Sequence, residues 1–215
     1  MTVDPDLLAD WTRGWALTRG VAPPVREADD GWRIEVGQPD QIRRHVYAGA
    51  DEAVARRAAT INTPRILLKV CAEPEAVRAL LSDRWEVAQT GVLMTLTGPM
   101  TPRGAARADG YEVELDRVGV VVFCRMLDAG GNEAARGRAV RVGDRAIYDR
   151  IATADGHRRR GLASAVMLAL EGAMRDRGAG DGVLVATAEG RILYETLGWR
   201  LCAPYTTAQI PAPEG

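Results

Sequence analysis

The chain has very little lysine, histidine, phenylalanine or cysteine. Its 215 residues include two histidines, three cysteines, one phenylalanine and a single lysine, Lys69, so nearly all the basic charge is arginine. We give that bias no mechanistic weight, because genome composition alone can produce it. Cys71, Cys124 and Cys202 are far apart and odd in number, which fits a reducing compartment. Without a CxxC pair, two histidines do not make an ordinary zinc site, and we expect no metal.

The chain also lacks long apolar runs and a strong net charge. No segment approaches the roughly 20 apolar residues that a membrane helix needs, and the acidic start, residues 1–10, lacks the apolar core of a signal peptide. The net charge of −1 gives no bulk attraction to nucleic acid or to an anionic membrane. We therefore expect a cytoplasmic, globular protein with room for one large domain or two small ones.

Hydrophobic periodicity predicts mixed helices and strands in the first half. Residues 6–18 are predicted to form a helix, because Leu7, Leu8, Trp11 and Trp15 fall on one face. Further helices are predicted over 51–61 and 74–81, and strands over 32–36, 65–72 and 85–97. The segment 98–110 is rich in Gly, Pro, Ala and Arg, and we interpret it as the connection between two domains, 1–103 and 104–215.

In the second half, a run of strands precedes a strand–helix–strand unit. The predicted strands cover 111–115, 118–127, 134–142, 146–153, 182–187 and 199–210, the last with a break at Pro204. The predicted helices cover 162–177 and 189–197. The crossover helix requires strands 146–153 and 182–187 to run parallel if they are neighbours. The predicted fold class is therefore α/β (α+β in finer schemes), with a mixed, mostly antiparallel sheet flanked by helices.

The order strand, helix, tryptophan occurs twice along the chain. It comprises 65–72, 74–81 and Trp85 in the first half, and 182–187, 189–197 and Trp199 in the second. Sequence identity between the two is low, so a duplication and a coincidence of unrelated pieces are equally open. The first half has no equivalent of the basic loop described next, and a copy would therefore have lost that site.

The most informative stretch is Arg158-Arg159-Arg160-Gly161-Leu162-Ala163, between a predicted strand and a predicted helix. Backbone N–H groups at a helix N-terminus lack partners within the helix, and the helix dipole adds partial positive charge there. Gly161 and Ala163 keep side-chain bulk away, so a pyrophosphate can approach the backbone. A solvated basic turn is the alternative, and the position between strand and helix favours the phosphate site. Ser164 is placed either to contact a phosphate oxygen or to cap the helix.

Two segments together resemble the GNAT N-acetyltransferase superfamily. Its donor-binding loop, Gln/Arg-x-x-Gly-x-Gly/Ala, is matched by Arg158-x-x-Gly161-x-Ala163, and its later Tyr-x-x-Leu-Gly-Phe segment resembles Tyr194-Glu195-Thr196-Leu197-Gly198-Trp199. The resemblance covers residues from about 111 to 210. The first hundred residues match the family only vaguely and are expected to form a degenerate GNAT-like half or a substrate cap.

The resemblance implies how acetyl-CoA would bind. The backbone N–H groups of 159–164 would hold the pyrophosphate, and the main chain of 151–153 would pair with the pantetheine arm where two parallel strands splay apart. A backbone N–H in that strand would polarise the thioester carbonyl, and Tyr194 would protonate the departing CoA thiolate. The residues implied in donor binding are Ile151, Ala152, Thr153, Arg158, Arg159, Arg160, Gly161, Leu162, Ala163, Ser164 and Thr187. Thr187 departs from the asparagine that the family often has there.

The general base is harder to identify from the sequence. An amine acceptor must lose a proton before it attacks, which calls for a carboxylate or a water chain. Asp149 lies in the strand beside the donor site, and strict alternation would place Asp149, Ile151 and Thr153 on one face. Glu189 follows the next strand. A salt bridge to an arginine is the alternative for either carboxylate, and His157 is expected to be an ordinary loop residue.

The sequence therefore predicts an acetyl-CoA-dependent N-acetyltransferase whose amine-bearing acceptor attacks the bound thioester directly, with Tyr194 and Asp149 as catalytic residues. A CoA-sensing or partner-binding module without turnover is the second hypothesis. A nucleotide-binding protein is disfavoured, because no Gly-Lys-Ser/Thr and no G-x-G-x-x-G is present. No nucleic-acid or membrane partner is expected. The acceptor and the oligomeric state stay open, a homodimer included.

Overall fold

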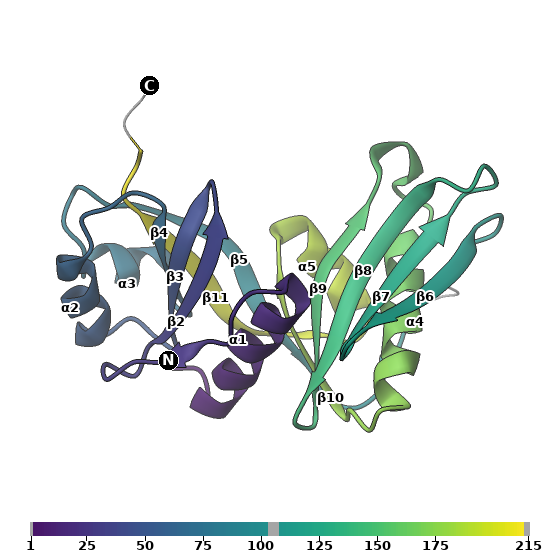
Figure 1. Ribbon diagram of the computed structural model, residues 1–215, viewed down its shortest axis with the longest axis horizontal. Coiled ribbons are helices and arrows are strands. Elements are labelled where there is room, and N and C mark those ends of the chain that lie inside the picture. Colours follow the sequence, from purple (N-terminus) through teal and green to yellow (C-terminus); the bar gives the residue numbers. More distant parts are fainter. Residues whose placement is uncertain (1, 103–107, 213–215) are drawn as a thin grey trace. The chain divides into compact units, whose positions relative to one another are not determined.

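The computed structural model describes residues 2–102 and 108–212, without the side chains of 89 and 90. Its elements follow in the order α1 (Pro5–Arg19), β1 (Val25–Arg26), β2 (Trp32–Gln38), β3 (Gln41–Tyr47), α2 (Glu52–Thr60), β4 (Ile66–Val70), α3 (Pro74–Arg78), β5 (Glu86–Leu96), β6 (Glu112–Val118), β7 (Val121–Leu127), β8 (Glu133–Val142), β9 (Arg145–Thr153), the 3₁₀ turn η1 (Asp155–His157), α4 (Leu162–Arg175), β10 (Asp181–Ala186), α5 (Ala188–Thr196) and β11 (Arg200–Gln209) (Figure 1). Within the described residues, no helix is long and apolar enough to cross a bilayer.

The chain divides into two compact units that are interleaved along the sequence. Unit 1 comprises Met1–Leu93, Val185–Ala188 and Leu201–Gly215, and unit 2 comprises Met94–Leu184 and Glu189–Arg200. Each unit therefore takes residues from both sides of the segment 98–110. The division into domains 1–103 and 104–215 follows the sequence rather than these units and stays a prediction.

Most of the predicted elements are present, and three differ for clear reasons. Strand β3 was not predicted; it pairs with β2 through a tight turn at Pro39 and Asp40, and Gly37, whose φ of 66° suits glycine, lies in β2 where the register shifts just before that turn. The strand predicted over 118–127 begins only at Val121, because Gly119 makes the turn from β6. Pro204 does not break β11. The ladder between β11 and β4 uses residues 206–208, so the N–H that proline lacks is not needed there.

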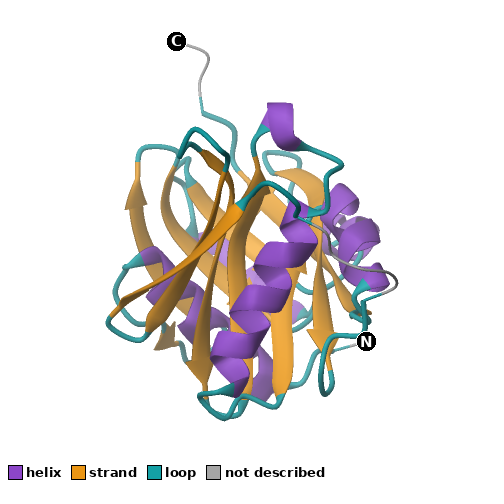
Figure 2. Ribbon diagram, turned by 90° about the vertical axis from the view of Figure 1, so that its right-hand side faces the viewer, coloured by secondary structure: helices purple, strands orange, loops and turns teal. Residues whose placement is uncertain are grey.

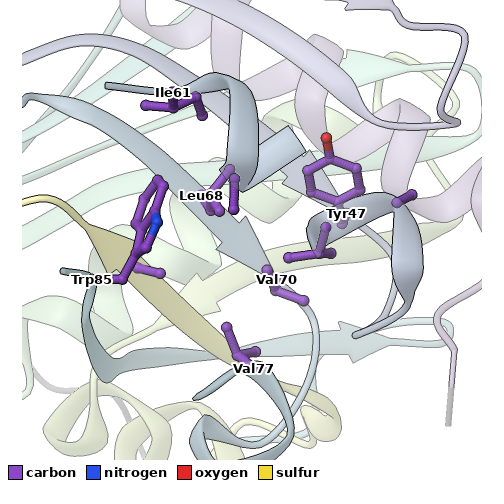
Figure 3. Close-up of a cluster of buried hydrophobic side chains, with 10 residues drawn as sticks. Tyr47, Ile61, Leu68, Val70, Val77 and Trp85 are labelled. Carbon is purple, nitrogen blue, oxygen red and sulfur yellow. The ribbon is translucent and has the colours of Figure 1, made fainter. Parts of the chain in front are cut away.

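Unit 1 is built on a mixed sheet with the strand order β1-β2-β3-β4-β11-β5. Strands β3 and β4 are parallel and are joined through α2, whereas the β2–β3 and β4–β11 pairs are antiparallel. One face of this sheet packs against α2 and α3 through a cluster of buried side chains (Figure 3). The cluster consists of Tyr47, Ala53, Val54, Ala58, Ile61, Leu68, Val70, Val77, Trp85 and Ala208. Each fully buried aliphatic side chain of this kind contributes roughly 1.5–3 kcal/mol.

Unit 2 carries the order β10-β9-β8-β7-β6. Strands β9 and β10 are parallel, as the crossover rule predicted, and the pairs from β9 to β6 are antiparallel. Helix α4 buries Leu162, Val166, Leu170 and Met174, which recur with helical spacing, against the sheet. Figure 2 shows helices lying against the strands. Both units thus contain a parallel pair joined by a helix, so their likeness extends beyond the strand, helix and tryptophan seen in the sequence.

A β-bulge in β9 corrects one expectation about the site. Residues Asp149 and Ala152 lie opposite Arg138 and Arg136 of β8, so β9 has two residues where β8 has one, and Arg150 takes a left-handed φ of 55°. Directly opposed residues share a face. Asp149 therefore lies on the face of Arg138, whereas Ile151 and Thr153 lie on the α4 face, and the single face predicted for all three is wrong.

The α4 face requires glycine at 137. A Cβ built there would lie 2.5 Å from Ile151 Cδ1 and 2.6 Å from Val166 Cγ1. We expect Gly137→Val to lower the free energy of unfolding by about 1–3 kcal/mol through overpacking, measured by urea denaturation. Gly156→Val is the matched control, since a Cβ at 156 meets nothing within 4 Å. Equal stability of the two variants would contradict the close packing of α4 on β8.

Candidate functional site

The parallel ladder of unit 2 ends halfway along β9. The recorded pairs join Arg145–Ile147 with Asp181–Val183, although β9 continues to Thr153. Among the described residues, the β9–β10 ladder has no pair beyond Ile147, so the main chain of 151–153 lies past the end of that ladder, where another extended chain can pair. The predicted splaying of the parallel pair is thus present, and it exposes the segment 151–153 named from the sequence.

The chain leaves β9 through η1 and turns into α4 at Gly161. Two left-handed residues shape this turn, Arg159 with φ of 62° and Gly161 with φ of 79°. Gly161 is the N-cap of α4, no side chain is recorded as capping the helix, and its first turn has no acidic residue. The helix therefore keeps its N-terminal amides and its partial positive charge for an external anion. Ser164 was predicted either to contact a phosphate or to cap this helix. Within the described residues, its side chain makes no capping hydrogen bond.

The corresponding helix of unit 1, α2, has a side-chain cap at its N-terminus. Asp51 is the N-cap of α2, and its carboxylate accepts a hydrogen bond from the Ala53 N–H at 2.9 Å. The β3–β4 ladder continues from Arg43–Ile66 to Tyr47–Val70 without the early end seen in β9–β10. Unit 1 therefore lacks both features that leave the site of unit 2 accessible.

Side chains around the turn hold the loop in place. The Tyr111 hydroxyl lies 2.8 Å from His157 Nδ1 and accepts a hydrogen bond from Arg160 Nη1 at 3.1 Å. His157 Nε2 lies 3.8 Å from an Asp128 carboxylate oxygen, and Arg158 pairs with Asp155 at 2.9 Å. Neither Tyr111 nor Asp128 lies in a motif, so neither was predicted to belong to the site. Their contacts show that His157, expected to be an ordinary loop residue, anchors the turn.

Tyr194 is positioned by the way α5 ends. The N–H of Trp199 bonds the carbonyl of Tyr194 at 3.1 Å, and the N–H of Gly198 bonds that of Glu195 at 3.2 Å, with Gly198 at φ of 92°. This is a Schellman ending, in which the residue after the glycine packs back on the last turn. The rings of Trp199 and Tyr194 accordingly lie 6.1 Å apart. The Tyr-x-x-Leu-Gly-Trp pattern thus fixes the orientation of Tyr194.

The environment of Tyr194 disfavours loss of the phenol proton. Burial raises the pKa of the phenol well above its ordinary value, and the negative charge of Asp149 raises it further. The two residues predicted to be catalytic therefore interact electrostatically, from β9 and α5 of one unit. Glu189, the alternative base, is exposed in the first turn of α5. Thr187 belongs to unit 1, and its predicted contact with the donor stays a prediction.

Comparison with known families places this architecture. Residues 105–199 match the model of the acetyltransferase (GNAT) family. This part of the chain is a GNAT domain. It contains the end of β9, the loop, α4 and Tyr194, so the resemblance seen in the loop and the Tyr-x-x-Leu-Gly-Trp segment is confirmed. Acyl transfer is the reaction that this family and fold imply. No curated protein matches the chain in sequence.

Solved structures extend the likeness of fold beyond the GNAT domain. A GCN5-related N-acetyltransferase from Kribbella flavida aligns with a TM-score of 0.67 at 13% identity, covering 99% of this chain and 97% of the other. A putative GNAT-family acetyltransferase from Novosphingobium aromaticivorans gives 0.59 at 17% identity, covering 96% and 97%. A GCN5-related N-acetyltransferase from Sphaerobacter thermophilus gives a TM-score of 0.59 at 12% identity, covering 98% of this chain and 95% of the other. The first half therefore shares the fold of GNAT structures.

The interaction between Asp149 and Tyr194 can be tested by titration. Replacing Asp149 by asparagine removes a negative charge that disfavours the phenolate, so the Tyr194 pKa should fall while burial keeps it above the ordinary tyrosine value. Carbon-13 NMR of labelled tyrosine Cζ follows the titration, and Tyr194→Phe assigns the signal. An unchanged or higher pKa in Asp149→Asn would contradict the interaction.

Proposed function

We propose that the chain is an N-acetyltransferase that moves an acetyl group from acetyl-CoA to an amine-bearing acceptor. The support comes from one juxtaposition: the end of β9, past its last pair with β10, leads through η1 into the turn around Gly161 and the N-terminus of α4, which has no side-chain cap. An extended ligand arm that ends in a diphosphate matches this sequence of a β-edge followed by a helix N-terminus.

The donor would bind through main-chain groups. The pyrophosphate takes the N–H groups of 159–164, with the adjacent arginines adding positive charge, and the pantetheine arm pairs with 151–153. The bulge at Arg150 matters here, because it lies past the last β9–β10 pair at Ile147, while β9 stays paired with β8 as far as Thr153. A backbone N–H at this position is suited to polarise the thioester carbonyl, on which negative charge develops during attack.

The chemistry couples a base to an acid. The acceptor amine attacks the thioester carbonyl, an amide bond forms, the carbon–sulfur bond breaks and the CoA thiolate leaves. Asp149 takes the proton that the amine loses, and Tyr194 supplies one to the thiolate. While Asp149 is charged, Tyr194 is a weak acid, since burial and the charge of Asp149 both raise its pKa. Protonation of Asp149 removes that charge, so accepting the amine proton makes Tyr194 a better acid at the step that needs it.

Donor binding is the first test. Titration calorimetry with acetyl-CoA should give saturable binding at sub-millimolar concentration with one site per chain, because unit 1 has a capped helix and a closed ladder. Gly161→Val should abolish it, since its φ of 79° strains a branched residue and the side chain would cover the amides. Gly156→Val, five residues away, should bind normally. No binding by the unmodified chain would refute the proposal.

Turnover is tested by Tyr194→Phe. Thiol release with a panel of amines should fall by roughly 10²-fold, the lower range for loss of a general acid, while the Kd for acetyl-CoA stays within about twofold. Tyr111→Phe is the contrasting variant: it removes the bonds to His157 and Arg160 and should weaken donor binding with little effect on kcat. Saturable CoA binding without thiol release from any amine would instead assign a CoA-sensing role.

A further inference from the structure

The single lysine of the chain lies inside unit 1, in the middle of the sheet. Lys69 is on β4, opposite Val46 of β3 and Thr207 of β11, and is only partly exposed. Its Nζ donates a hydrogen bond to Thr207 Oγ1 at 2.6 Å and lies 5.9 Å from the centre of the Tyr205 ring. An ammonium group has three N–H donors, and one hydroxyl and one ring face satisfy it poorly.

The face of the sheet that carries Lys69 brings a second cation close to it. Arg44 of β3 points to the same face, where its guanidinium carbon lies 3.7 Å from the centre of the Trp15 ring of α1. Among the described residues, no carboxylate is recorded within ion-pair distance of Lys69 Nζ. The opposite face differs, because there Arg57 pairs with Glu27 at 3.2 Å and with Asp29 at 2.9 Å.

This arrangement disfavours the charged form of Lys69. Burial lowers the pKa of the amine, and the positive charge of Arg44 lowers it further, to about 7. At neutral pH, roughly half of the Lys69 side chains are then uncharged amines. An uncharged primary amine with its lone pair available is a nucleophile, whereas the ordinary lysine ammonium is not.

We propose that Lys69 is a site of acyl modification, at which the side-chain amine attacks thioesters. The Nζ attacks the thioester carbonyl, an N–C bond forms, the carbon–sulfur bond breaks, and the thiolate leaves and takes up the proton that the amine loses. The acetyl-lysine that results keeps one N–H, which Thr207 Oγ1 can accept. It carries no charge, so the repulsion by Arg44 ends. Because the thioester acts directly, this modification is independent of the donor site in unit 2.

The chain offers a clean measurement, because Lys69 and the N-terminal amine are its only primary amines. The probe is S-acetyl-N-acetylcysteamine, a small thioester without any phosphate, so the result does not depend on the donor loop. Peptide mapping by mass spectrometry separates the two amines, and the N-terminal one serves as an internal reference. We expect acetylation of Lys69 in the folded chain, with a rate that reaches half its maximum near pH 7 rather than near the ordinary lysine value of 10.5.

Two comparisons decide the outcome. Arg44→Gln removes the repelling charge and should move the half-maximal pH of Lys69 acetylation upward, with folding checked by circular dichroism. The same chain in denaturant should show the ordinary lysine midpoint. The proposal is overturned if the folded chain acetylates its N-terminal amine but not Lys69, or if the midpoint for Lys69 lies near 10.5. Gly161→Val should acetylate Lys69 like the unmodified chain, so failure of donor binding and failure of this proposal are distinguishable.

Discussion

The bulge at Arg150 is the constraint on which the site depends. A regular strand would keep pairing with both neighbours and would carry Asp149, Ile151 and Thr153 on one face. The extra residue instead lets β9 stay paired with β8 while its side chains exchange faces. Ile151 then packs toward α4 above Gly137, and Asp149 is left on the opposite face, where its charge acts on Tyr194. The left-handed conformation of Arg150 thus puts Ile151 on the face that packs against α4 and Asp149 on the opposite face.

Local chemistry explains why much of the site was predictable. The loop 158–163 and the Tyr-x-x-Leu-Gly-Trp segment are short motifs whose glycines have a geometric reason, since Gly161 and Gly198 both adopt positive φ. Periodicity gave α1, α2, α4 and the strand–helix–strand unit. The bulge was not predictable, because Arg150 has no feature of sequence that favours a left-handed conformation. The anchoring of the loop by Tyr111 was missed as well, since it joins residues 46 to 49 positions apart.

The two units share an architecture but differ at the start of the helix that joins their parallel strands. Both join a parallel pair of strands through a helix, and the likeness to GNAT structures covers 99% of the chain in one case. In unit 2 the ladder ends early and the helix starts at a glycine. In unit 1 the ladder runs on, and the Asp51 carboxylate takes up an amide at the start of α2. An aspartate at an N-cap stabilises a helix by roughly 0.5–2 kcal/mol. Unit 1 therefore gains stability at the helix start that unit 2 leaves without a side-chain cap.

Each unit also contains a chemically relevant titratable group whose charged form is disfavoured both by burial and by a neighbouring charge. Tyr194 is buried beside the negative Asp149, and Lys69 is buried beside the positive Arg44. In both, desolvation and a charge of the same sign as the ionised group act in one direction, so the neutral form dominates or competes at neutral pH. The consequences are opposite in chemical sense: a neutral phenol is a proton donor, and a neutral amine is a nucleophile. In both, the neighbour sets the reactivity, because neutralising Asp149 favours loss of the tyrosine proton and removing the charge of Arg44 favours the ammonium form of Lys69.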